Sequence, residues 1–365
     1  MRNIADTIRR LNATRIPAAP FAVSGLNTRL QHLADFGQNP GALRAWQYIP
    51  PTFGPGSPLV VVLHGCTQTA ASYDRGSGWS ELADAHGFAL LFPEQQRNNN
   101  ANLCFNWFDP RDTTRGHGEV ASISQMVLAM TEKYLIDRAR IYATGLSAGG
   151  AMAVAMLATY PELFKAGAII AGLPFGTAST IPEAFDRMRG HGMPESRALA
   201  DKVRQASDYQ GPWPAVSVWQ GTADTTVDPI NMEAIISQWW QLQELNDTPI
   251  VTSLAQAHRC RTWKDANGSV CIEGHTINGM VHGTPIKTSG PDGYGTSGTF
   301  MLDVGISSTW HIASSWDLLT EGERQAVETP KPSFALFATD ASPKPDDHAI
   351  GTVIEGALRA AGLMR

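Results

Sequence analysis

Leu59–Leu63 is a run of five aliphatic residues that follows a loop rich in proline and glycine. Such a continuous run, three residues of which are β-branched, is typical of a strand buried on both faces of a sheet. Further short apolar runs follow at residues 87–93, 139–144, 166–170 and 215–218. Segments of helical periodicity lie between or after them, at residues 71–86, 119–134, 148–159 and 231–245. This alternation predicts an α/β fold in which helices cover both faces of a mostly parallel sheet.

The regular alternation extends over most of the 365 residues and predicts one main domain at residues 46–320. We expect a helical or extended N-terminal segment at residues 1–45 and a C-terminal extension at residues 321–365. Between residues 174 and 212 the pattern loosens and contains no buried strand, which indicates an insertion. The insertion could be a lid over the functional site or a plain surface excursion, and the sequence favours neither.

The formal net charge is −6, and no run of lysine and arginine is present. This charge balance argues against a nucleic-acid partner. The apolar stretches are too short to span a bilayer, so we expect no membrane insertion. Residues 1–20 lack the continuous apolar core of a secretory signal and show helical spacing instead, which predicts a short amphipathic helix or a targeting segment.

The pentapeptide Gly-Leu-Ser-Ala-Gly at residues 145–149 has the pattern G-x-S-x-G. In a nucleophile elbow, a sharp strand-to-helix turn holds the serine in a strained backbone conformation, and flanking glycines avoid clashes with neighbouring elements. Here a buried strand precedes the motif and an apolar helix follows it. The context predicts an α/β-hydrolase fold with Ser147 as the nucleophile.

Ser147 needs a general base and a carboxylate that orients the base, and in this fold they follow in the order serine, acid, histidine. The strand near residues 215–219 leads into a loop that contains Asp224, which we expect to be the acid. Asp228 lies in the same loop and is the alternative. Its other interpretation is a cap for a helix that starts near Pro229.

Ten histidines compete for the role of the base. His282 lies in a glycine-flanked loop after an expected strand at residues 271–277, where a terminal strand of the sheet would deliver a mobile imidazole. His275 within that strand and His311, which follows at helical spacing, remain alternatives.

A tetrahedral intermediate needs preorganised N–H donors for its oxyanion. One donor should be the amide of Ala148, directly after the nucleophile. The second should come from the turn after the Leu59–Leu63 strand, where Cys66 or Thr67 would supply it. We interpret His64, at the start of this turn, as a structural residue.

The four cysteines contain no Cys-x-x-Cys pair, so we expect no zinc site. Cys260 and Cys271 flank an Asn-Gly turn that predicts a hairpin, and a disulfide between them is geometrically reasonable. Such a bridge would imply an oxidising compartment, in tension with the absence of a recognisable secretory signal.

Five segments together carry a resemblance to a known family. They are residues 63–68 (Leu-His-Gly-Cys-Thr-Gln), 106–108 (Asn-Trp-Phe), 145–150, 220–227 and 282–285. With these segments the chain resembles the polyhydroxybutyrate-depolymerase-type esterases, which are relatives of feruloyl and acetylxylan esterases. The match covers roughly residues 45–318.

The resemblance implies hydrolysis of carboxylic esters without metal or cofactor, through a triad of Ser147, Asp224 and His282. The implied substrate is a poly(3-hydroxybutyrate)-type polyester or its oligomers. Feruloyl or acetylxylan esters are the alternative, and a serine peptidase or a non-catalytic binding module is a second alternative. Trp107 becomes a candidate for binding the acyl chain, or else a core tryptophan.

The resemblance also bears on Cys66 and Cys104, which stand beside two of the shared segments. A bridge between them would brace the oxyanion turn, whereas two buried free thiols are the alternative. Extracellular members of the family carry a signal and often a separate substrate-binding domain, and neither is recognisable in this sequence. The resemblance and the possible disulfides favour an extracellular or periplasmic enzyme. The two departures from the family favour soluble oligomers or small esters over crystalline polymer.

Overall fold

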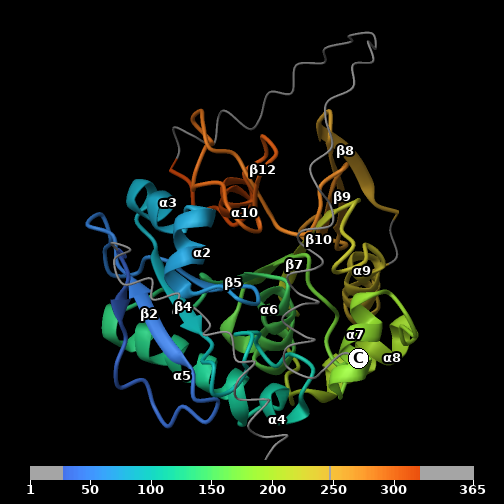
Figure 1. Ribbon diagram of the computed structural model, residues 1–365, viewed down its shortest axis with the longest axis horizontal. Helices are drawn as coiled ribbons and strands as arrows, with labels where there is room; N and C mark the ends of the chain where they lie inside the picture. Colours follow the sequence, from blue (N-terminus) through green and yellow to red (C-terminus); the bar gives the residue numbers. More distant parts are fainter. Residues whose placement is uncertain (1–27, 246–247, 321–365) are drawn as a thin grey trace, which may run out of the picture.

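The computed structural model describes residues 28–245 and 248–320, and a ten-stranded sheet runs through it (Figure 1). In spatial order the strands are β1 (Gln31–His32), β2 (Arg44–Tyr48), β4 (Ala89–Glu94), β3 (Leu59–Leu63), β5 (Ile141–Leu146), β6 (Ala166–Ile170), β7 (Ala215–Gly221), β10 (Val270–Ile277), β9 (His258–Lys264) and β8 (Ile250–Ala255). The six strands from β4 to β10 are parallel to one another, and antiparallel strands flank them at both edges. The expectation of a mostly parallel sheet is confirmed.

Helices cover both faces of this sheet. One face packs against α5 (Gly118–Tyr134), α6 (Ala148–Thr159), α8 (Ser196–Gln205) and α9 (Ile230–Leu242). The other packs against α2 (Ala70–Ser77), α3 (Trp79–His86) and α10 (Ser308–Ser315). Strand β3 contributes Val61 to the first core and Val60 to the second, because successive side chains of a strand point to opposite faces. This explains why the strand is apolar throughout.

The helical spacing expected over residues 71–86 is confirmed, but residues 70–86 form two helices rather than one continuous helix. The break is at Gly78, which has a left-handed backbone conformation with φ of 75° and caps both α2 and α3. A Cβ atom at Gly78 would lie 2.4 Å from the amide nitrogen of Gly295. The loop that contains Gly295 therefore packs directly against the backbone at the junction of the two helices.

The insertion at residues 174–212 contains no strand, as expected, and forms α7 (Ile181–Met188) and α8. Helix α8 buries Leu199, Ala200 and Val203 and packs against α9. A short helix, α4 (Pro110–Thr113), a 3-10 turn at Pro161–Leu163 and a parallel pair, β11 (Thr284–Ile286) and β12 (Met301–Asp303), complete the elements.

The expected C-terminal extension at residues 321–365, and residues 1–27 of the expected N-terminal segment, lie outside the described residues. Within residues 28–245 and 248–320, no helix combines the length and the hydropathy that crossing a bilayer requires.

We expect Gly78→Ala to lower the free energy of unfolding by about 2–4 kcal/mol, because it adds a backbone clash to the strain of a left-handed conformation. Gly116→Ala is the matched control: Gly116 has φ of 83° but open space around its Cβ position, so only about 1 kcal/mol should be lost. Urea unfolding of both variants measures the difference. Equal losses would contradict the role given to the close approach.

Candidate active site

Ser147 occupies the turn between β5 and α6. Its backbone has φ of 56° and ψ of −117°, a combination that L-residues rarely adopt. The Ser147 amide donates a hydrogen bond to the carbonyl of Ile170 on the neighbouring strand, at 2.8 Å. The serine is 8% exposed. This is the strained strand-to-helix turn expected from the pentapeptide.

The glycines of the pentapeptide allow the close packing behind this turn. A Cβ atom on Gly149 would lie 2.3 Å from the carbonyl oxygen of Leu63 and 2.5 Å from that of His64. A Cβ atom on Gly145 would lie 2.5 Å from the backbone of Gly149. Helix α6 can therefore start directly against the end of β3 only when both positions lack a side chain.

Asp224 and His282 are brought together from positions 58 residues apart in the chain. Nδ1 of His282 lies 2.7 Å from Oδ2 of Asp224, and both side chains are nearly inaccessible to solvent. The other carboxylate oxygen accepts the amides of Thr226 and Val227, each at 2.9 Å. These contacts fix the carboxylate and leave Nε2 as the free nitrogen of the imidazole.

Gln220 and Phe300 also hold this pair, and the sequence reasoning missed both. The Gln220 amide donates to Oδ2 of Asp224 at 2.9 Å and to the carbonyl of Val227 at 3.0 Å, so it ties the strand end to the loop. The ring of Phe300 lies edge-on to His282, with centroids 6.0 Å apart. Gln220 stands four residues before the expected acid and within the shared segment 220–227, which is the signal in the sequence that could have revealed it.

The alternative candidates have other contacts. Asp228 accepts the amide of Ile230 at 2.9 Å, which is the helix-capping role considered for it. His275 lies within β10 and stacks on Trp219 at a centroid distance of 3.8 Å. His311 is a helix residue of α10, as its spacing predicted.

The turn after β3 distinguishes between the two expected oxyanion donors. The amide of Thr67 donates to the carbonyl of Asn102 at 2.7 Å, so it is already engaged in a hydrogen bond. This leaves the amide of Cys66. Ala148 is the first residue of α6, and an amide in the first turn has no acceptor within its own helix.

The Cys66–Cys104 disulfide ties this turn to the loop before α4. His64 braces the turn from within: its Nδ1 lies 2.8 Å from the carbonyl of Gly65, and its Nε2 lies 3.1 Å from the amide of Gln95. Burial lowers the pKa of His64, so its imidazole stays neutral and suits these two contacts. The interpretation of His64 as structural is confirmed.

Glu119 is a buried carboxyl that the sequence reasoning also missed. It accepts the side-chain amide of Gln95 and, at 2.9 Å, the backbone amide of Asn106. Burial, with the nearby charge of Asp112, raises its pKa well above the usual range. Through these contacts Glu119 fixes the start of the segment that contains Trp107.

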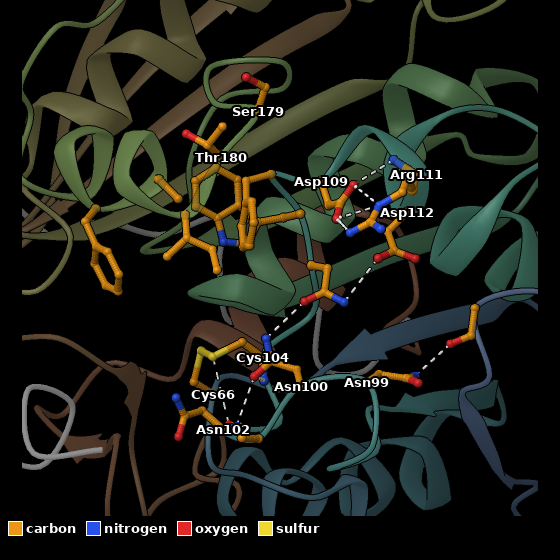
Figure 2. A pocket seen from close by; sticks show the side chains of 18 of the residues that line it. Cys66, Asn99, Asn100, Asn102, Cys104, Asp109, Arg111, Asp112, Ser179 and Thr180 are labelled. Carbon is orange, nitrogen blue, oxygen red and sulfur yellow. Dashed lines mark hydrogen bonds and ion pairs between the residues drawn. A yellow bond between two sulfur atoms is a disulfide. The ribbon is translucent and has the colours of Figure 1, made fainter. Parts of the chain in front are cut away.

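A cavity of about 660 Å³ adjoins the turn that contains Cys66 (Figure 2). Trp107 is part of its lining. Its apolar wall includes Phe108 and the side of α7 formed by Ile181, Ala184, Phe185 and Met188. Polar groups surround the rest, including Asn100, Asn106, Asp109, Arg111, Asp112, Ser179 and Thr180. Trp107 is 8% exposed and also belongs to the main core, so it contacts both the cavity and the interior.

The disulfide considered between Cys260 and Cys271 is not formed, and both thiols are free. The hairpin itself is present, with its turn between β9 and β10. Its register places Cys260 opposite His275, while Cys271 lies at an irregularity between Val270 and Ile272. The turn was therefore expected correctly, but the two cysteines lie at different heights along the paired strands.

We expect the double variant Cys66→Ser, Cys104→Ser to lower the free energy of unfolding by about 3–4 kcal/mol, because the bridge closes a long loop in the unfolded chain. The matched control is Cys271→Ser, which removes a free, partly exposed thiol and no bridge, so a much smaller loss is expected. Chemical denaturation measures both. A loss below 1 kcal/mol for the first variant would contradict the bracing role.

Comparisons with known proteins agree with this geometry. Residues 45–253 match the family described as esterase PHB depolymerase. The chain is 41% identical over 307 residues to poly(3-hydroxyalkanoate) depolymerase C from Paucimonas lemoignei, covering 83% of this chain and 74% of that protein. It is 32% identical over 266 residues to acetylxylan esterase A from Aspergillus oryzae, covering 70% of this chain and 85% of that protein.

Among solved structures, the acetyl xylan esterase from Aspergillus awamori superposes with a TM-score of 0.65 at 25% identity. The match covers 69% of this chain and 93% of that one. The chain thus has the α/β-hydrolase fold and is a carboxylic-ester hydrolase. It belongs to the PHB depolymerase family of esterases.

Proposed function

We propose that Ser147, His282 and Asp224 form the catalytic triad of this esterase. Nε2 of His282 takes the proton of the Ser147 hydroxyl as its oxygen attacks the ester carbonyl. The hydrogen bond from Nδ1 to Asp224 selects this tautomer and stabilises the imidazolium that forms. His282 then protonates the leaving alcohol, and a water molecule activated by the same imidazole hydrolyses the acyl-enzyme.

The amides of Ala148 and Cys66 stabilise the oxyanion in this proposal. Both donors are preorganised, the first by the start of α6 and the second by the turn that the disulfide braces. A donor of this kind contributes on the order of 3 kcal/mol to transition-state stabilisation. The strained backbone of Ser147 supports the same assignment, because strain of this type collects at functional sites.

The substrate we propose is a poly(3-hydroxyalkanoate)-type polyester, taken as oligomers. The cavity beside the oxyanion turn has a volume within the range of about 300–1,000 Å³ that holds drug-sized ligands, so it suits a few repeat units. Its apolar wall suits the short alkyl branch of each unit, and its amides and hydroxyls suit the ester groups. The similarity to the Paucimonas lemoignei depolymerase supports this choice.

An acetylated or feruloylated sugar is the second candidate, and the polar rim favours it. The carboxylates of Asp109 and Asp112 could accept hydrogen bonds from sugar hydroxyls. The similarity to acetylxylan esterases supports the same alternative.

The Cys66–Cys104 bridge supports an oxidising compartment, such as the periplasm or the extracellular space.

Hydrolysis of p-nitrophenyl butyrate tests the triad. We expect Ser147→Ala to lower kcat at least about 10⁴-fold and Asp224→Asn about 10³–10⁴-fold, because the asparagine favours the wrong tautomer of His282. Asp228→Asn is the matched control from the same loop and should stay within about threefold of the parent. Activity retained by Asp224→Asn, or lost by Asp228→Asn with the fold intact, would overturn the assignment of the acid.

A substrate panel tests the specificity. We expect kcat/KM for a 3-hydroxybutyrate trimer ester to exceed that for acetylated xylobiose and methyl ferulate by at least about tenfold. Trp107→Ala should lower kcat/KM for the trimer about tenfold or more, through lost apolar contact, and that for p-nitrophenyl acetate much less.

Trp213→Ala is the control for the panel, since Trp213 lines a different hollow. A preference for the sugar esters would favour the second candidate. Equal losses on both substrates after Trp107→Ala would assign Trp107 to the core alone.

A further inference from the structure

Four polar side chains meet on one face of the β9–β10 hairpin. Cys260 lies opposite His275, and Thr262 lies opposite Glu273. Because side chains two residues apart in a strand point to the same face, these two cross-strand pairs form a compact square. Three of its corners are strong ligands for metal ions: a thiol, an imidazole and a carboxylate.

The three potential ligand atoms converge. The Cys260 sulfur lies 3.8 Å from Nε2 of His275, and that nitrogen lies 3.7 Å from Oε2 of Glu273. All three ligand atoms lie within 4.8 Å of one another. Tetrahedral zinc, with bonds of about 2.3 Å to sulfur and about 2.0–2.1 Å to nitrogen and oxygen, would hold such atoms roughly 3.4–3.6 Å apart. Small side-chain adjustments close the remaining difference.

His275 is held in an orientation that suits a metal ligand. Its other nitrogen, Nδ1, lies 2.9 Å from Nε2 of His258, and its ring stacks on Trp219 with an interplanar angle of 3°. In the tautomer in which Nδ1 donates its proton to Nε2 of His258, the lone pair of Nε2 faces the thiol and the carboxylate, as a metal ligand requires. Ligating histidines commonly have an outer partner of this kind, which fixes the tautomer and the ring.

We propose that Cys260, Glu273 and His275 bind one zinc ion, with a fourth position left for water. A thiolate favours zinc over the hard cations magnesium and calcium, and the mixed set of sulfur, nitrogen and oxygen is within the range zinc accepts. Cys260 is 5% exposed, which is unfavourable for a thiol nucleophile acting on substrate but suits a ligand. The Glu273 side chain is 21% exposed and gives the ion a path of entry.

The position of this site connects it to the rest of the sheet. The ion would join β9 to β10 by side chains in addition to the backbone ladder, near an edge of the sheet (Figure 1). Strand β10 ends at Ile277, and the loop that follows it contains His282. A clamp on the hairpin would therefore hold the strand from which the imidazole loop departs.

Zinc titration of the chelator-stripped full-length protein, in competition with a chromophoric chelator, tests the site. We expect one equivalent bound, and affinity lowered by more than about 100-fold in Cys260→Ser and in Glu273→Gln, since loss of a direct ligand should exceed the 10–100-fold effect of an outer partner. Cys271→Ser is the matched control: it removes the other free thiol of the same hairpin and should bind like the parent.

Cobalt substitution gives a second readout, because a thiolate ligand produces a charge-transfer absorption band. The band should appear in the parent and in Cys271→Ser and be absent from Cys260→Ser. Circular dichroism checks that each variant folds. If Cys260→Ser fails to fold, the zinc affinity of Glu273→Gln, whose side chain is more exposed, tests the site instead. Failure of the parent to bind zinc, unchanged affinity in a folded Glu273→Gln, or loss of binding in Cys271→Ser would overturn the proposal.

Discussion

The close approach of helix α6 to the end of β3 is the constraint on which the site depends. Gly149 lets the helix start where a single added carbon would lie 2.3 Å from a backbone carbonyl. The chain then has only one residue, Ser147, in which to turn from strand to helix, and that residue takes a strained conformation. The surrounding parallel strands are buried on both faces and hold this turn in place, so the fold stabilises the strain that the site requires.

Much of this architecture could be predicted from the sequence, because the signals were local. The apolar runs of β3 and β6 predict buried strands, and the apolar segment of α6 predicts a helix. The pentapeptide at residues 145–149 predicts the sharp turn between strand and helix. The sequence analysis did not place the break at Gly78, a glycine in the left-handed conformation that ends one helix and starts the next. The packing of Gly295 against it, from more than 200 residues away in the chain, has no local signal at all. Local sequence predicts the conformation of a segment. Contacts between loops that are distant in the chain depend on the whole fold and are not predicted by it.

The same distinction applies to the site. Asp224 and His282 could be named because the order of such residues along the chain is a property of the fold, and they lie in hydrogen-bonding contact. The choice between the amides of Cys66 and Thr67 as oxyanion donor could not be made from the sequence. It depends on the hydrogen bond that the Thr67 amide donates to the carbonyl of Asn102, which is visible only in the structure. Cysteine spacing likewise misled, because the hairpin register pairs Cys260 with a histidine. The proposed metal ligands come together by strand pairing, which no sequence motif reveals.

The proposed triad makes Ser147 a strongly activated nucleophile. Reaction with a fluorophosphonate, followed by peptide mapping in a mass spectrometer, tests it most directly, because only an activated serine attacks the phosphorus rapidly. We expect one adduct per chain, on the peptide that contains Ser147, formed much more slowly when His282 is replaced by alanine. A stoichiometric adduct on any other serine, or rapid labelling that does not depend on His282, would contradict it.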